Sequence, residues 1–261
     1  MTLLNFKLLS AVLIISSFSV VNSQSTSSLF SYEEYVNTQG DTLKYRQLVC
    51  DYADDTKKYP LVIFLHGMGE RGNNNEAQLK WGVRNFATSE NMSQNPCIVI
   101  APQCPDNSVW GSYNRNMELQ PEPTKPMKLL RELINELIKK SPVDPNRIYI
   151  TGLSMGGFGT YDAISRYPDL FAAAVPVCGG GDISKAKDFA HMPIWIFHGA
   201  IDSIVKPILS INMLNALIEA GATPGYTQYP EVGHFSWIMA YSDKNMMTWL
   251  FKRRKESKLT N

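Results

Sequence analysis

Hydrophobic residues along this chain gather in short runs that are separated by polar, glycine-rich segments. Mostly apolar runs lie at residues 61–65, 97–101, 147–151, 172–177 and 194–198, and a shorter one lies at 226–229. Runs of this length predict strands that are covered on both faces, as in a parallel sheet. Residues 42–51 instead alternate between apolar and polar positions, which predicts an early antiparallel strand.

Segments with helical periodicity lie between these runs. Residues 157–167 and 204–220 read as helices, and residues 127–140 place five apolar side chains on one helical face, namely Leu130, Leu133, Ile134, Leu137 and Ile138. Strands that alternate with helices predict a single α/β domain with a mainly parallel sheet, helices on both faces and a site at the carboxyl ends of the strands. The proline- and asparagine-rich interval 102–126 is too long for a plain connection and predicts a rim or lid over that site.

The charge balance bears on the partners of the protein, and the N-terminus bears on its compartment. The chain has 25 Lys and Arg against 24 Asp and Glu, so it has no electrostatic footprint for nucleic acid. Lys7 precedes an apolar stretch, residues 8–21, that is too short to span a bilayer. This predicts an export signal over 1–23, a mature domain over 24–261 and a secreted or periplasmic location without stable membrane insertion. A retained membrane anchor is the alternative.

Four cysteines would meet an oxidising compartment after export: Cys50, Cys97, Cys104 and Cys178. They allow three pairings, and the sequence selects none of them. Buried free thiols are the alternative. Their spacing does not suggest a zinc site, and we expect neither a metal nor an organic cofactor.

The chemistry is indicated by Gly152-Leu153-Ser154-Met155-Gly156, between a predicted strand and a predicted helix. A G-x-S-x-G in this context predicts a nucleophile elbow, in which glycines make room for a strained turn that exposes the serine hydroxyl above a helix N-terminus. Ser154 is therefore the predicted nucleophile of an α/β-hydrolase fold.

The partners of the nucleophile follow in the order acid, then histidine. Among the four histidines, only His234 lies beyond the late acidic candidates, on a loop after the run 226–229. Asp202 follows the carboxyl end of the strand 194–198 and is the predicted acid, with Asp182 as its main rival. His66 and His198 lie at strand ends, where we expect them to support loops, and His191 is expected in a surface loop.

An oxyanion hole is predicted where the strand 61–65 runs into His66-Gly67-Met68-Gly69-Glu70-Arg71-Gly72. This early loop and the residue after the nucleophile supply one backbone N–H each in such folds, which assigns the donors to Met68 and Met155. A phosphate-binding loop is disfavoured because the segment lacks G-x-x-x-x-G-K-[ST].

Several motifs together carry a family resemblance: the oxyanion segment, Ala101-Pro102-Gln103-Cys104-Pro105, the serine motif, Cys178-Gly179-Gly180-Gly181-Asp182, and Gly233-His234-Phe235-Ser236-Trp237. Over roughly residues 41–254 the chain resembles secreted bacterial esterases related to polyhydroxybutyrate depolymerases, dienelactone hydrolases and carbohydrate esterase family 1. The resemblance implies a serine carboxylesterase that acts through an acyl-enzyme on small or oligosaccharide esters, with feruloyl or acetyl groups on plant polysaccharide fragments as expected substrates.

Substrate choice is assigned to aromatic residues near the predicted rim. Trp110 and Trp237 are the expected contacts for a phenolic acyl group or a sugar ring, and packing beneath the histidine loop is the alternative for Trp237. Three other functions stay open: a serine peptidase of the prolyl-oligopeptidase kind, an acyltransferase and a binding module without turnover. The sequence does not indicate an oligomeric state.

Overall fold

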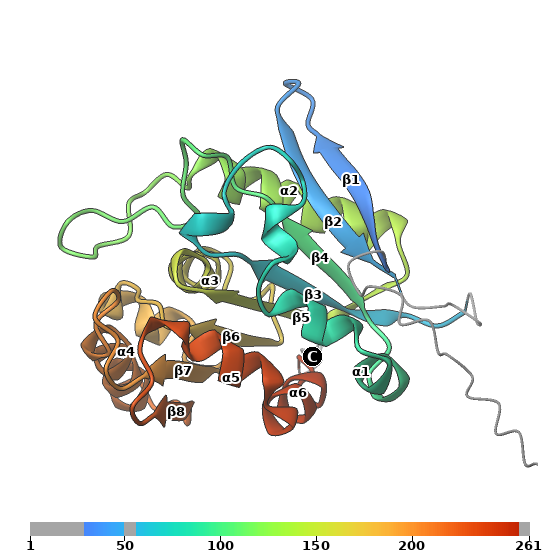
Figure 1. Ribbon diagram of the computed structural model, residues 1–261. Helices are drawn as coiled ribbons and strands as arrows, with labels where there is room; N and C mark the ends of the chain where they lie inside the picture. The colour runs from blue at the N-terminus through green and yellow to red at the C-terminus, as the bar shows by residue number, and fades with distance from the viewer. Residues whose placement is uncertain (1–28, 50–55, 256–261) are drawn as a thin grey trace, which may run out of the picture.

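The computed structural model describes residues 29–49 and 56–255, which form one eight-stranded sheet in the order β1-β2-β4-β3-β5-β6-β7-β8 (Figure 1). β2 pairs antiparallel with β1 and β4, and the remaining neighbours pair in parallel, which confirms the predicted mainly parallel sheet. The strands are β1 (Phe30–Val36), β2 (Thr42–Leu48), β3 (Tyr59–Leu65), β4 (Ile98–Pro102), β5 (Val143–Leu153), β6 (Ala173–Val177), β7 (Trp195–Gly199) and β8 (Gly225–Tyr229).

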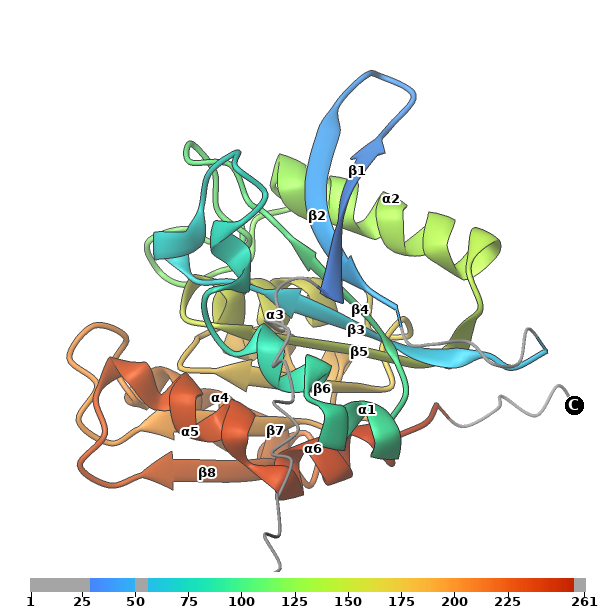
Figure 2. The same ribbon diagram turned by 45° about the vertical axis from the view of Figure 1, so that its right-hand side comes forward.

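Helices cover both faces of this sheet, as Figures 1 and 2 show. α2, α3 and α4 contribute side chains to the core on one face, and α5, α6 and a 3₁₀ helix (Val83–Ala87) contribute to the core on the other. The α-helices are α1 (Ser89–Gln94), α2 (Lys125–Lys140), α3 (Met155–Arg166), α4 (Ile208–Glu219), α5 (Trp237–Ser242) and α6 (Lys244–Phe251).

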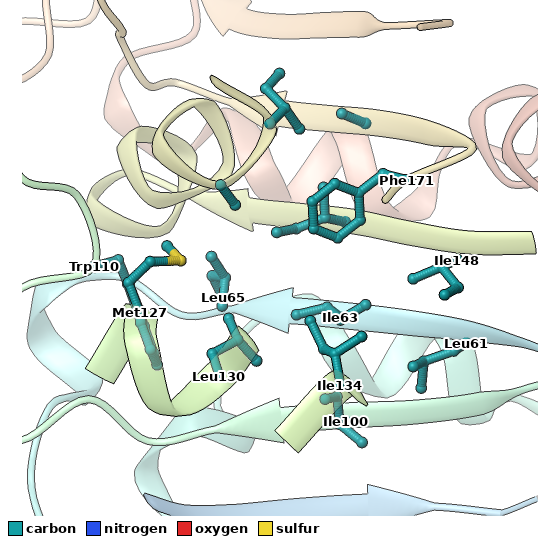
Figure 3. Packing of buried hydrophobic residues seen from close by; sticks show 14 of the residues in the cluster. Leu61, Ile63, Leu65, Ile100, Trp110, Met127, Leu130, Ile134, Ile148 and Phe171 are labelled. Carbon is teal, nitrogen blue, oxygen red and sulfur yellow. The ribbon is translucent and has the colours of Figure 1, made fainter. Parts of the chain in front are cut away.

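The central strand β3 shows why a continuous apolar run is needed here. Its side chains alternate between the two faces, and every residue of the strand is buried. Ile63 and Leu65 lie in one core with Leu130 and Ile134 of α2, whereas Phe64 belongs to the opposite core (Figure 3). A strand that is packed on both faces has apolar side chains on both, and this explains the continuous apolar run in the sequence.

Several boundaries and elements differ from the predictions. Helix α4 begins at Ile208 rather than at residue 204, because residues 202–205 form a turn around the Asp202 carboxylate and Pro207 precedes the helix. The hydrophobic pattern does not predict β1, α1 or α5. The basic run 252–255 follows the end of α6, and there Arg254 forms an ion pair with Asp144 at the start of β5.

Two other predictions concern the N-terminus and the cysteines. No helix within residues 29–49 and 56–255 is long and apolar enough to cross a membrane. The predicted export signal and Cys50 lie outside the described residues. Cys104 and Cys178 are free and fully buried thiols, so for these two the alternative of hidden thiols holds over a disulfide.

Candidate active site

A pocket of about 660 Å³ opens at the carboxyl ends of the parallel strands, where the predicted site lies. β3 leads into the oxyanion segment, β5 into Ser154, β7 toward Asp202 and β8 toward His234. Five aromatic side chains line the pocket together with Ser154 and His234: Trp81, Tyr113, Phe158, Phe235 and Trp237.

Ser154 occupies a sharp turn between β5 and α3. Its φ of 53° and ψ of −117° place a non-glycine residue in a strained region of backbone space. The two flanking glycines are required by space: a Cβ at Gly152 would lie 2.4 Å from the Gly156 carbonyl oxygen, and one at Gly156 would lie 1.9 Å from the Leu65 carbonyl oxygen. This close approach lets α3 begin directly beneath the serine, at Met155.

The structure brings Ser154, His234 and Asp202 into one chain of hydrogen bonds. His234 Nδ1 lies 2.7 Å from Asp202 Oδ2, and His234 Nε2 lies 2.9 Å from Ser154 Oγ. Because a carboxylate only accepts, Nδ1 carries the proton and Nε2 accepts from the serine hydroxyl. The imidazole is therefore oriented to take a proton from Ser154.

The Asp202 carboxylate is 2% exposed but has several donors. Its Oδ1 accepts the backbone N–H groups of Ile204 and Val205, each at 2.9 Å, and its Oδ2 faces His234. Three hydrogen bonds thus fix the carboxylate of Asp202 with one oxygen facing the imidazole.

Asp182, the rival acid, has a different task. Its Oδ2 accepts the N–H of Leu119 in the 102–126 segment, and its Oδ1 accepts from the backbone and hydroxyl of Ser184. Burial by itself would raise the pKa of Asp182, but these donors outweigh it and hold the pKa below its ordinary value. Its two oxygens are occupied in fixing the rim, not in orienting His234.

Met68 and Met155 each begin a helix that points at the pocket. Met68 is the first residue of the 3₁₀ helix Met68–Glu70, and Met155 is the first residue of α3. The first N–H groups of a helix have no partner within it, so both amides are available to a ligand. Both residues line the same pocket as Ser154.

Three carbonyl groups of the oxyanion segment accept hydrogen bonds from side chains. Trp110 Nε1 donates to the His66 carbonyl, His66 Nδ1 donates to the Gly67 carbonyl and Arg71 Nε donates to the Met68 carbonyl. His66 Nε2 also accepts the Cys104 N–H at 2.9 Å. Burial lowers the pKa of His66 to about 4, so the ring that links the two loops is neutral at physiological pH.

The substrate-contact prediction for Trp110 is corrected by its position. The ring is fully buried, stands edge-on to His66 and does not line the pocket, whereas its neighbours Val109 and Gly111 do. Its indole N–H is used to hold the oxyanion segment. Trp237 does line the pocket, although it is only 5% exposed, and its ring lies edge-on to His234 at 5.1 Å.

The segment 102–126 borders the pocket through Val109, Gly111, Tyr113, Asn114 and Met117. It is anchored by buried acceptors, since Asp162 Oδ2 accepts the Ser112 N–H and Tyr113 donates to the Phe158 carbonyl of α3. The predicted rim is therefore a fixed wall of the pocket.

Sequence reasoning missed several pocket residues. Trp81 and Phe235 form an edge-on pair at the pocket, and the buried Glu70 lines it from the oxyanion segment. Phe235 adjoins His234 and Glu70 lies within the predicted donor loop, so both were within reach of a motif argument. Trp81 lies in a segment without regular periodicity, and nothing local indicated its place.

One group in the described part of the chain has the composition of a metal site. Ligand atoms of Cys178, Asp202 and His234 lie within 4.8 Å of one another. Burial raises the pKa of the Cys178 thiol to about 12, so it carries its proton at neutral pH and is a poor ligand. Asp202 and His234 are already bonded to each other, and these residues do not fit a resident metal ion.

Known proteins share this architecture and parts of this sequence. The chain is 28% identical over 147 residues to the bifunctional acetylxylan esterase/xylanase XynS20E of Neocallimastix patriciarum. The matched region covers 56% of this chain and 20% of that protein. It is 36% identical over 125 residues to feruloyl esterase B of Piromyces equi, covering 40% of this chain and 23% of the other. The chain thus spans a quarter or less of the length of these relatives.

A solved structure described as a thermostable esterase matches with a TM-score of 0.84 and 38% identity, over 88% of this chain and 64% of the other. This match and the sheet order give the chain an α/β-hydrolase fold. The sequence model of the phospholipase/carboxylesterase family matches residues 52–244. The chain belongs to this family of carboxylic ester hydrolases.

Proposed function

We propose that this carboxylesterase works through an acyl-enzyme on Ser154, with His234 as general base and Asp202 as its orienting acid. The observation that carries the proposal is the hydrogen-bonded chain from Ser154 Oγ through His234 to Asp202, at 2.9 and 2.7 Å. These distances lie within the range that proton transfer requires. The strained backbone of Ser154 aims the hydroxyl into the pocket.

The reaction runs in two halves. His234 Nε2 takes the hydroxyl proton as Ser154 Oγ bonds to the ester carbonyl carbon, and it then returns that proton to the departing alcohol as the ester C–O bond breaks. Water, activated by the same imidazole, attacks the acyl-enzyme and releases the carboxylic acid and the free serine. Asp202 stabilises the imidazolium that exists in both halves.

The amides of Met68 and Met155 are assigned to the oxyanion that forms in each half. Met155 begins the 12-residue helix α3, so the partial positive charge of the helix N-terminus adds to its N–H. One such donor contributes about 3–4 kcal/mol of transition-state stabilisation. Their side chains can vary without loss of this function.

For the substrate, we favour hydroxycinnamoyl esters on plant polysaccharide fragments over acetyl esters. An acetyl group would leave most of a pocket of about 660 Å³ unfilled, whereas Trp81, Phe158 and Phe235 provide apolar faces for an aromatic ring. The chain is similar to a feruloyl esterase and also to an acetylxylan esterase, so the preference rests on the pocket. The proposal also keeps residues 1–23 as an export signal and residues 24–261 as the catalytic domain outside the cytoplasm.

The test compares methyl ferulate, p-nitrophenyl acetate and a peptide p-nitroanilide on the wild type and on Ser154→Ala. We expect ester turnover that falls by about 10⁴-fold or more in the variant. Ser165→Ala is the matched control, because Ser165 lies on the same helix and its hydroxyl donates only to the Tyr161 carbonyl. Ester turnover that survives in Ser154→Ala would overturn the assignment, and cleavage of the anilide alone would favour the peptidase.

The substrate preference has its own test. Phe235→Ala removes an exposed aromatic wall of the pocket without touching the hydrogen-bonded chain. We expect kcat/KM for methyl ferulate to fall about 10-fold and that for p-nitrophenyl acetate to change less than 3-fold, since ring contacts contribute about 1 kcal/mol each. Equal losses on both esters would contradict the aromatic preference.

A further inference from the structure

His198 is a fully buried histidine beside the proposed triad that the mechanism above does not use. It lies near the carboxyl end of β7, four residues before Asp202. Its Nε2 lies 2.9 Å from the Val205 carbonyl oxygen and 3.4 Å from Asp202 Oδ2, and its Nδ1 lies 2.7 Å from Ser210 Oγ on α4. Each ring nitrogen therefore has a specific partner.

These partners fix the proton on the ring. A carbonyl oxygen and a carboxylate only accept, so Nε2 must carry the hydrogen, and Nδ1 is then free to accept from the Ser210 hydroxyl. Burial lowers the pKa of His198 below its ordinary value, although the Val205 carbonyl and Asp202 act in the opposite direction. The titratable groups that face it are Asp202 and His234. The ring is a neutral N–H donor.

The donor acts on the acid of the triad in two ways. It holds the Val205 carbonyl, while the Val205 N–H donates to Asp202 Oδ1, so the turn 202–205 is closed onto the carboxylate. It also stands near Oδ2, the oxygen that His234 uses. The same carboxylate oxygen is thus approached by His234 and by His198.

We propose that His198 is a positioning residue, an N–H donor that fixes the Asp202 carboxylate against His234 and shares its negative charge. This inference rests on the proposed function of Ser154, His234 and Asp202. It assigns to His198 more than the support of a loop, because it makes the basicity of His234 depend on a residue that never contacts substrate.

The first test uses three variants. His198→Leu removes both polar atoms at similar volume, and His198→Gln keeps a donor and an acceptor. Ser210→Ala removes the partner of the opposite ring nitrogen, together with the 3.4 Å contact of that hydroxyl with the Gly179 carbonyl. In His198→Leu we expect kcat to fall about 10- to 100-fold with KM within 3-fold, because a misdirected carboxylate misplaces the imidazole. His198→Gln should recover most of that loss, and Ser210→Ala should stay within 3-fold of the wild type.

The pH profile separates positioning from plain packing. Without the second donor, the full charge of Asp202 acts on His234, so the acid limb of kcat/KM should move to higher pH by about half a unit in His198→Leu. It should stay in place in Ser210→Ala, even if that variant unfolds at lower temperature. A reduced kcat with an unmoved limb in His198→Leu would show that His198 only packs, and would overturn the proposal.

A second measurement needs no turnover and no variant that might misfold. Nitrogen NMR of the histidine rings in the wild type should show His198 as the Nε2–H tautomer, without titration between pH 5 and 8. A His198 that takes up a proton in that range would overturn the proposal. If esters are not hydrolysed but these spectra hold, the proposed function fails while the link from His198 to Asp202 and His234 stands.

Discussion

The nucleophile turn offers a sharp test, because its geometry depends on the absence of a single methyl group. In Gly156→Ala the new Cβ would lie 1.9 Å from the Leu65 carbonyl oxygen, 2.6 Å from the Leu65 carbonyl carbon and 2.8 Å from the His66 carbonyl oxygen. All three atoms are backbone, so no side chain can swing aside. Ordinary contact begins at 3.4 Å, so α3 and the end of β3 must separate by about 1.5 Å.

This separation would affect both the proposed nucleophile and the proposed oxyanion hole. The end of β3 leads into Met68, and α3 begins at Met155 directly after Ser154, so the two proposed oxyanion donors would move apart. A misplacement of about 1 Å costs on the order of 100-fold in rate, and overpacking costs about 1–3 kcal/mol of stability. We therefore expect kcat/KM to fall at least 100-fold in protein that is still folded at 25 °C.

The assay is hydrolysis of p-nitrophenyl acetate, with circular dichroism to confirm folding and Gly233→Ala as the matched control. A Cβ at Gly233 would meet nothing within 4 Å, and its φ of −83° lies outside the left-handed region. The control should keep its activity within about 2-fold, as a surface-type substitution. Activity of Gly156→Ala within 3-fold of the wild type would refute the spatial argument for this glycine.

Three further predictions follow from single residues. Asp202→Asn should lower kcat about 10⁴-fold with little change in fold, measured by steady-state kinetics, because the amide favours the wrong tautomer of His234; a loss under 10-fold would exclude Asp202 as the acid. The pKa of His66 falls from 6.5 to about 4 on folding, so the unfolded chain binds the proton first and stability should drop by about 3 kcal/mol as pH falls from 6.5 to 4. Urea unfolding across this range should show a smaller drop in His66→Gln, and equal drops would contradict the assignment. Asn91 lies in an Asn-Met-Ser glycosylation sequence, but it is 7% exposed and donates to the Phe86 carbonyl. We therefore expect no glycan on Asn91 in the folded protein. Mass spectrometry of protein expressed in a glycosylating host checks this, and a glycan on Asn91 would contradict it.

The sequence predicted the parts of the fold that are governed by burial on two faces. β3 and β7 were found as apolar runs because neither face of the strand meets water. β1 was not predicted because it is an edge strand whose residues are mostly exposed or half-buried. Its composition is therefore polar and shows no pattern of buried positions. Strand and helix ends shifted by a few residues where a turn competed, as at the start of α4.

Some residues of the site could also be predicted from the sequence, whereas others depend on tertiary packing. Ser154, Asp202 and His234 were placed by order and by strand ends, and the structure brings these three together. Trp110 was misassigned because its loop lies over the strand ends while its ring turns inward to His66, a choice that tertiary packing makes. Trp81 could not be found, because its nearness to Phe235 joins segments that are far apart in sequence.

The most direct measurement is covalent labelling by a fluorophosphonate, with the modified peptide identified by mass spectrometry. Rapid modification requires a serine whose hydroxyl is activated by a neighbouring base. The account predicts one adduct, on Ser154, formed within minutes in the wild type and at least 100-fold more slowly in His234→Ala. An adduct on another residue, or labelling that is indifferent to His234, would contradict it.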